Sequence, residues 1–411
     1  MNYELFIAKR IIAGKEYKNS ISSPIIKIAI TAIALGIVIM LIAVTTSAGL
    51  QTKIRDKMAG FKGHVQIVNY DNNNSEVSAV PIDKNQDFYP KFKTITGIKN
   101  VQVFASKGGI LRTENDFEGI IFKGVSKDFN WSFFKEYLVA GRIPDLTLPR
   151  TKEILLSKTV MSRLQLQLND TILSTFPKNN TNKIPSNRKY TIVGIYNTGF
   201  AQFDNSVMIG DLREVQRLNK WTSNQVGGFE VLIDNFDNIE EKGNEIYNQI
   251  GAQLNSKTIV ESYPNIFDWI QLFDNNVSFI IAIMILIASI NMITALLVLI
   301  LERVQMIGIL KALGSNSWSI RKVFLYNASY LILKGLFWGN TIGFTILLFQ
   351  KYTGIITLDP ATYYVSEVPV YMNFTNILLL NLGTLVLCFT MLLIPSYIIT
   401  KINPAKSIKF G

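Results

Sequence analysis

The sequence predicts a multi-pass α-helical membrane protein with four transmembrane helices and a large α+β domain between helices 1 and 2. Four long apolar stretches lie in the chain, and a more polar segment of about 220 residues separates the first two. Only 17% of the 411 residues are charged, whereas soluble domains carry about 25%. One cysteine and one histidine exclude a disulfide framework, a cysteine zinc cluster and a multi-histidine metal site.

The apolar stretches are each long enough to cross a bilayer, which takes about 20 helical residues. Two of them, Ile28–Thr52 and Asn275–Leu301, contain no charged residue. The third, Val323–Gln350, is interrupted only by Lys334, and the fourth is strongly apolar from Ile377. We place the spans at 28–49, 274–301, 320–350 and 375–400. The first is too long for the apolar part of a cleaved signal peptide, which favours an uncleaved anchor.

The distribution of Lys and Arg predicts the orientation of the spans. These residues gather in the N-terminal segment 1–27, in the loop 302–319 with the adjoining start of the third span, and in the tail 401–411. Together these regions hold about +9 of the formal charge of +11. Because such residues concentrate on the cytoplasmic side, both termini are predicted there, with 50–273 and 351–374 outside. The positive charge therefore records orientation and does not indicate nucleic-acid binding.

The segment 50–273 is predicted to be one α+β domain, with no internal repeat. Runs rich in Val, Ile, Phe and Tyr, bounded by Gly, Asn and Asp, predict strands. These are His64–Asn69, Ile110–Arg112, Gly119–Val125, Glu153–Leu156, Tyr190–Tyr196 and Phe229–Ile233. Helices are expected at Lys158–Leu166, Leu212–Asn219 and Ile239–Leu254.

The stretch STFPKNNTNKIPSNRKY, Ser174–Tyr190, has two prolines, four asparagines and no apolar periodicity. Its composition is that of a solvated hairpin loop. The alternative is a projecting hairpin that grips a partner.

The loop ERVQMIGILKALGSNSWSIRKVF, Glu302–Phe324, predicts a short helix between two spans. Val304, Ile307, Leu310 and Leu313, with Ile309, would form a broad apolar face. Arg303, Gln305 and Lys311 would form its polar counterpart. Gly314 is a natural helix stop, and Ser315–Ser317 supply a turn and a cap. Such a helix could rest on lipid or dock a soluble partner, and physical chemistry alone leaves both open.

This loop resembles the cytoplasmic motif of the MacB/FtsX/LolCE-type ABC permeases, E-[RK]-x3-I-[GA]-[IL]-L-[KR]-[AT]-[LIM]-G. The resemblance covers the whole chain. FIAKRIIAGKEYKNSISSP, GVSKDFNWSFFKEYLVAGRIP, VGIYNTGFAQFDNS, YYVSEVPV and INPAKSIKFG resemble the lipoprotein-releasing (LolC/LolE) branch.

The resemblance implies that the helix is a coupling helix that rests in a groove of a separate ATPase. The contact residues carried over are Glu302, Arg303, Ile307, Gly308, Ile309, Leu310, Lys311, Ala312, Leu313 and Gly314. ATP-driven closure of two ATPase subunits would move this helix and its flanking spans. A lipoprotein would leave the outer leaflet of the bacterial inner membrane and pass to a periplasmic carrier. Hairpin residues that could hold the carrier are Pro177, Lys178, Ile184, Pro185 and Arg188.

No G-x4-G-K-[ST] occurs in the sequence. We therefore expect no cofactor in this chain, with ATP and Mg bound by the partner ATPase. The family architecture implies a second permease, and the sequence does not decide between a copy and a homologue. An efflux or peptide-export permease (MacB-like) and an FtsX-like mechanotransmission subunit that regulates an external enzyme are the alternatives.

Several single residues have two interpretations. Asn291 could hydrogen-bond across helices or touch cargo. Tyr363 and Tyr364 fit an interfacial aromatic belt, and the resemblance adds cargo contact. Lys334 is either a functional charge inside the membrane or a lysine that snorkels to the interface. Cys388 would fill the core, and Pro395 would kink the fourth span. A lone His64 is no metal site.

Overall fold

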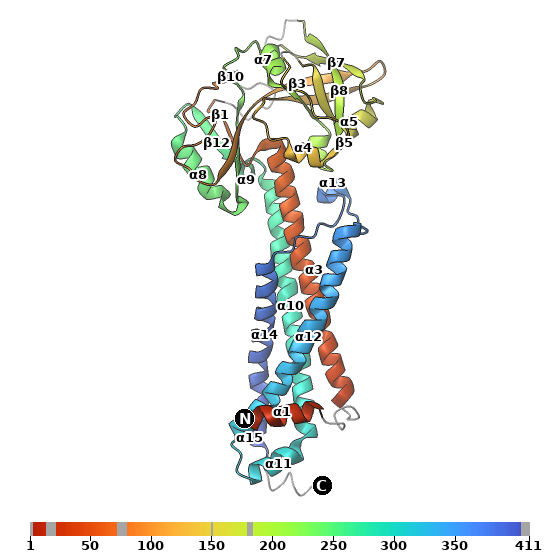
Figure 1. Ribbon diagram of the computed structural model, residues 1–411, viewed down its shortest axis with the longest axis vertical. Coiled ribbons are helices and arrows are strands. Elements are labelled where there is room, and N and C mark those ends of the chain that lie inside the picture. Colours follow the sequence, from red (N-terminus) through yellow and green to blue (C-terminus); the bar gives the residue numbers. More distant parts are fainter. Residues whose placement is uncertain (1–2, 14–21, 72–79, 149–150, 179–183, 404–411) are drawn as a thin grey trace. The chain divides into compact units, whose positions relative to one another are not determined.

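The computed structural model describes residues 3–13, 22–71, 80–148, 151–178 and 184–403 (Figure 1). They form two compact units. The membrane unit comprises 1–50, 269–356 and 368–411, and the α+β unit comprises 51–268 and 357–367. The division falls inside two helices, α3 (Ser22–Lys62) and α10 (Pro264–Glu302), which contribute to both units.

Within the described residues, four helices are long and apolar enough to cross a membrane, as the sequence predicts: α3, α10, α12 (Ser317–Thr353) and α14 (Phe374–Ser396). Helices α3 and α10 are longer than the spans predicted within them, at 41 and 39 residues. Three short helices complete the described membrane unit: α1 (Tyr3–Ala13), α11 (Val304–Ala312) and α15 (Ile398–Lys401). Figure 1 places α1, α11 and α15 at the same end of the long helices.

Three glycines of α12 bring its backbone against α3. A Cβ added to Gly335, Gly339 or Gly343 would stand 2.6, 2.7 or 2.9 Å from a side-chain atom of α3, closer than real Cβ atoms approach. The facing residues are Ile33, Ile37 and Leu41. Small residues at four-residue spacing are a common device for close helix packing in membranes. This spacing is visible in the sequence but was not part of the prediction.

Helices α12 and α14 are joined by a polar pair. The Asn340 amide donates to Asn381 Oδ1 at 2.6 Å, and the Asn381 amide donates to Asn340 Oδ1 at 3.1 Å. Cys388 is fully buried on α14. Pro395 lies in the last turn of α14, and a separate short helix, α15, follows.

The α+β unit contains a ten-stranded mixed sheet in the order β12-β1-β11-β3-β4-β9-β6-β8-β5, with β7 paired to β3 and β8. Its strands are β1 (Val65–Asn69), β3 (Ile98–Arg112), β4 (Phe117–Val125), β5 (Leu138–Gly141), β6 (Glu153–Ser157), β7 (Thr171–Phe176), β8 (Ser186–Tyr196), β9 (Val207–Asp211), β11 (Gly228–Ile233) and β12 (Leu254–Thr258). A separate pair joins β2 (Ile82–Asp83) and β10 (Gln225–Val226). The helices are α4 (Ser132–Glu136), α5 (Lys158–Arg163), α6 (Ala201–Asp204), α7 (Leu212–Asn219), α8 (Ile239–Gln249), α9 (Ile259–Ser262) and α13 (Pro360–Tyr363), with a 3-10 turn at Phe236–Asn238.

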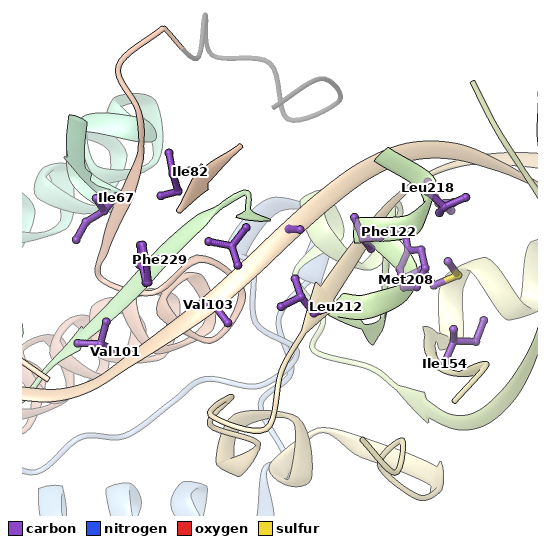
Figure 2. Close-up of a cluster of buried hydrophobic side chains, with 14 of the residues drawn as sticks. Ile67, Ile82, Val101, Val103, Phe122, Ile154, Met208, Leu212, Leu218 and Phe229 are labelled. Atoms are coloured by element: carbon purple, nitrogen blue, oxygen red, sulfur yellow. The ribbon is translucent and has the colours of Figure 1, made fainter. Parts of the chain in front are cut away.

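The apolar core of this unit lies along the sheet, and Figure 2 shows part of it. Phe122 of β4 and Phe229 of β11 are fully buried, and Leu212 and Leu218 of α7 belong to the same cluster. Burial of one aromatic or aliphatic side chain contributes about 1.5–3 kcal/mol. The predicted α+β class is therefore confirmed, with the hydrophobic strands forming one core.

Of the boundaries predicted in the α+β unit, two differ most from the structure; in addition, α5 ends at Arg163 and β8 begins at Ser186. The helix predicted at Ile239–Leu254 ends at Gln249, because the chain turns at Gly251 and Leu254 starts β12, which pairs with β1. The strand predicted at Ile110–Arg112 begins at Ile98. Its first half is buried at five consecutive residues, 101–105, so both faces are covered and the apolar–polar alternation of a half-exposed strand is missing.

Candidate functional site

The loop between the second and third membrane helices folds as the helix that the sequence predicts. Arg303 interrupts the helical run between α10 and α11, with φ −110° and ψ 22°. Gly314 takes φ +90°, which a residue with a side chain rarely adopts, and ends the last turn. The Asn316 side chain then accepts a hydrogen bond from the Trp318 amide at 3.2 Å and caps α12.

The residues of this segment divide into an outward and an inward set. Ile307 and Gly308 are buried, and Ile307 belongs to the core of the membrane unit. Ile309 and Leu313 are 46% and 79% exposed. The exposed positions recur every three or four residues, so they follow one face of a helix. This exposed stripe consists of Glu302, Gln305, Ile309, Ala312 and Leu313, with Gly314 at its end, while Arg303 and Leu310 are intermediate.

Lys311 points away from the exposed stripe. Its ammonium donates to three backbone carbonyls in and just after α15, the short helix that follows α14: those of Ile399 at 2.7 Å, Thr400 at 3.1 Å and Ile402 at 2.8 Å. Partial burial lowers the pKa of the Lys311 ammonium. The prediction that places Lys311 on the polar face of the helix is therefore wrong. Its hydrogen-bond partners lie about 90 residues further along the chain, where the local pattern does not indicate them.

Arg321, in the first turns of α12, makes a second connection to the fourth helix. Its Nε and Nη2 donate to Ser396 Oγ at 3.1 and 3.0 Å, and Nη2 also donates to the Leu393 carbonyl at 3.2 Å. The guanidinium carbon lies 4.9 Å from the Trp318 ring centroid and 5.8 Å from that of Tyr397. In the sequence, Arg321 stands out only as one of the basic residues that predict the topology.

Strands β7 and β8, at the two ends of the stretch 174–190, pair antiparallel as far as Phe176 and Ser186. Residues 179–183 of this stretch lie outside the described residues. Ile184 is 84% exposed. Of the candidate docking residues, Pro177, Ile184, Pro185 and Arg188 are exposed and Lys178 is intermediate.

Tyr364 packs inside the α+β unit. It adopts φ +60°, its ring stacks on Phe200 at 4.9 Å between centroids, and its carbonyl accepts from Lys57 Nζ at 2.8 Å. Tyr363 ends α13, and both tyrosines are half-buried.

Asn291 is half-buried on α10. Lys334 is exposed on α12, and its Nζ lies 4.7 Å from the Tyr330 ring centroid.

Sequence reasoning missed a buried ion pair in the sheet. Lys123 Nζ lies 2.6 Å from Glu230 Oε1 and also donates to the Phe61 carbonyl near the end of α3. The two side chains are 6% and 1% exposed. Gln102 donates to the other Glu230 oxygen at 2.9 Å. With 107 residues between Lys123 and Glu230, no local pattern signals the pair.

His64 lies between Gly63, which follows α3, and the start of β1 at Val65. The Ile233 amide donates to His64 Nδ1 at 3.1 Å. Burial, with a smaller contribution from the positive charge of Lys99, lowers the pKa of His64 to about 4. The imidazole is therefore neutral and serves as an acceptor between two strands.

Comparison with known proteins decides the family. Residues 28–249 match the MacB-like periplasmic core domain and residues 278–404 match the FtsX-like permease C-terminal model. The chain belongs to the MacB/FtsX family of ABC transporter permeases. It is 22% identical to the lipoprotein-releasing system transmembrane protein LolC of Neisseria meningitidis serogroup B, over 99% of both chains. It is 19% identical to LolE of Haemophilus influenzae, again over 99% of both.

The predicted resemblance to the lipoprotein-releasing branch is thereby confirmed, and so are the four membrane helices with a periplasmic α+β domain between the first two. Among solved structures, the periplasmic region of MacB from Actinobacillus actinomycetemcomitans is 13% identical with a TM-score of 0.34, covering 49% of this chain and 91% of that one. As an ABC permease subunit, the chain is a membrane component of a transporter in the inner membrane.

Proposed function

We propose that this permease uses ATP hydrolysis by a separate ATPase subunit to extract lipoproteins from the outer leaflet of the inner membrane and pass them to a periplasmic carrier. The exposed stripe on α11 carries this proposal. It presents two large aliphatic side chains, Ile309 and Leu313, at the end of a loop between two membrane helices. Exposed aliphatic residues on a rigid helix are a fitting surface for a partner's groove.

The proposal assigns ATP and Mg to the partner ATPase. Two ATPase subunits would each meet one coupling helix, so the working unit holds two permeases, either two copies or this chain with a homologue. Both termini would be cytoplasmic, because α11 must face the ATPase and the segments around it hold most of the excess Lys and Arg.

The names of the relatives support a lipoprotein as cargo, since LolC and LolE are described as parts of lipoprotein-releasing systems. On the periplasmic side, the β7–β8 hairpin offers exposed apolar and proline residues, Ile184, Pro177 and Pro185, beside Arg188. This combination would suit the docking of a carrier protein.

The ATPase contact is tested by substitution on the stripe. Leu313→Ser and Ile309→Ser should weaken co-purification of the ATPase at least about tenfold, because each removes a buried aliphatic contact of about 1.5–3 kcal/mol. Leu5→Ser is the matched control, since Leu5 is 40% exposed on α1 at the same end of the membrane unit. Equal ATPase recovery from all three variants and the wild type would contradict the contact.

Cargo release is tested in vesicles that contain the purified complex, labelled lipoproteins, ATP and a periplasmic carrier. We expect ATP-dependent transfer of the label to the soluble carrier. If the complex hydrolyses ATP while the lipoproteins remain in the membrane, the release function is refuted, and a mechanotransmission or export role takes its place.

A further inference from the structure

We propose that Lys311 and Arg321 are positioning residues that fasten the coupling segment to the end of the fourth membrane helix. Movement of α11 would then be passed to α14 as well as to α10 and α12. This inference rests on the proposed function, since it takes α11 to be the part that the ATPase moves. It assigns Lys311 a role inside this chain, where the family resemblance suggested an ATPase contact.

The Lys311 ammonium is well suited to hold the end of a helix in place. The last carbonyls of a helix lack intrahelical partners, and they carry the negative end of the helix dipole. An ammonium has three donors and no acceptor, so three carbonyls can satisfy it fully. The three distances to Ile399, Thr400 and Ile402 lie between 2.7 and 3.1 Å. One side chain thus fixes the chain on both sides of the point where α15 ends at Lys401.

The Arg321 contact uses a carbonyl that the helix itself has released. After Pro395, the Tyr397 amide donates to the Ile394 carbonyl at 3.1 Å, three residues back. The Leu393 carbonyl, four residues back, accepts instead from the Ser396 hydroxyl at 2.8 Å and from Arg321 at 3.2 Å. The guanidinium also holds the Ser396 hydroxyl and lies near two aromatic rings, an arrangement that a planar cation suits.

These contacts supply a connection that the backbone does not. Helix α11 is joined by short chain segments to α10 and α12, whereas α14 is separated from it in sequence by more than 60 residues. On a helix, residues two apart point about 200° from each other. Lys311 therefore points inward between Ile309 and Leu313, which point outward. A push on the exposed stripe would act on the Lys311 contact directly.

The test compares Lys311→Met, which keeps the aliphatic stem and removes the ammonium, with Lys311→Arg, which keeps donors. Lys401→Met is the matched control, because Lys401 is an exposed lysine at the end of α15. For each variant complex, ATPase co-purification, ATP hydrolysis, lipoprotein release per ATP hydrolysed, and hydrogen exchange of residues 397–402 are measured.

We expect Lys311→Met to bind the ATPase and hydrolyse ATP like the wild type, yet to release at least about tenfold fewer lipoproteins per ATP. Exchange at 397–402 should accelerate by about tenfold or more, since charge-assisted hydrogen bonds to this segment are lost. Lys311→Arg and Lys401→Met should behave like the wild type in both measurements.

If Lys311→Met loses ATPase binding to the same extent as it loses lipoprotein release, the proposal is overturned and Lys311 is an ATPase contact. Unchanged exchange or unchanged release per ATP would overturn it too. If Lys311→Met does not accumulate in membranes, Ser396→Ala carries the test, because it removes the hydroxyl that accepts from Arg321 and donates to the Leu393 carbonyl, and leaves the other side chains unchanged. If the wild-type complex releases no lipoprotein, the proposed function fails, and the exchange measurement still decides whether the attachment exists.

Discussion

The only histidine of the chain should make the α+β unit sensitive to mild acid. Folding lowers the pKa of His64 from its ordinary 6.5 to about 4, so between these values the unfolded chain binds one more proton than the folded chain. Stability must therefore fall as the pH falls through this window. Replacing His64 by Asn, whose Oδ1 can still accept from the Ile233 amide, removes the titration and keeps an acceptor.

The two pKa values set the size of the effect. One proton changes the free energy of unfolding by about 1.4 kcal/mol per pH unit once the pH is below the unfolded pKa. From about pH 7.5 to about pH 5, the wild type should lose about 2 kcal/mol through His64 alone. Carboxylates that titrate near the lower end of this pH range are common to the wild type and His64→Asn, so their effect cancels in the comparison.

The assay is hydrogen exchange of β11 peptides in the detergent-solubilised full chain, corrected for the pH dependence of intrinsic exchange. β11 carries the amide that His64 accepts. The wild type should lose about 2 kcal/mol more protection than His64→Asn between the two pH values. Equal pH slopes in the two proteins would refute the reasoning, whatever their absolute stabilities at neutral pH.

Three further predictions concern buried contacts. Gly339→Ala should reduce the amount of folded protein in the membrane, because the new Cβ would stand 2.7 Å from Ile37 Cβ. Gly383→Ala, whose Cβ would have nothing within 4 Å, should not reduce it, and the yield of folded, detergent-resistant protein measures both. Lys123→Met should lower the free energy of unfolding by about 3–5 kcal/mol, since it leaves the Glu230 carboxylate buried without its cation. Adding Glu230→Gln should recover part of this loss, as measured by thermal unfolding. Asn340→Ala should cost about 0.6–1.7 kcal/mol, the range of interhelical hydrogen bonds in membranes, as measured by unfolding in mixed micelles.

The sequence predicted what depends on local patterning. Four apolar stretches gave four membrane helices, and Leu212–Asn219 was placed with the bounds that the structure shows for α7. The stop at Gly314 and the cap at Asn316 followed from the backbone preferences of those two residue types. Each of these predictions needs only residues that are close to one another along the chain.

What the sequence missed depends on partners far along the chain. Lys311 looks like a surface lysine in its own helix, and only the position of residues 399–402 makes it an inward contact. Lys123 and Glu230 each sit in a strand where a charge is expected to be exposed. The strand β3 was shortened in the prediction because residues 101–105 are covered on both faces, and a covered strand loses its alternation.

The glycines of α12 give the interface between α12 and α3 a four-residue repeat. Gly335, Gly339 and Gly343 face residues of α3 that are themselves four apart and bear branched side chains. A slide of α12 along α3 by one repeat, about 6 Å at 1.5 Å per residue, would bring two of the three glycines opposite a branched partner again. The two registers would therefore share this type of glycine contact at two of the three positions.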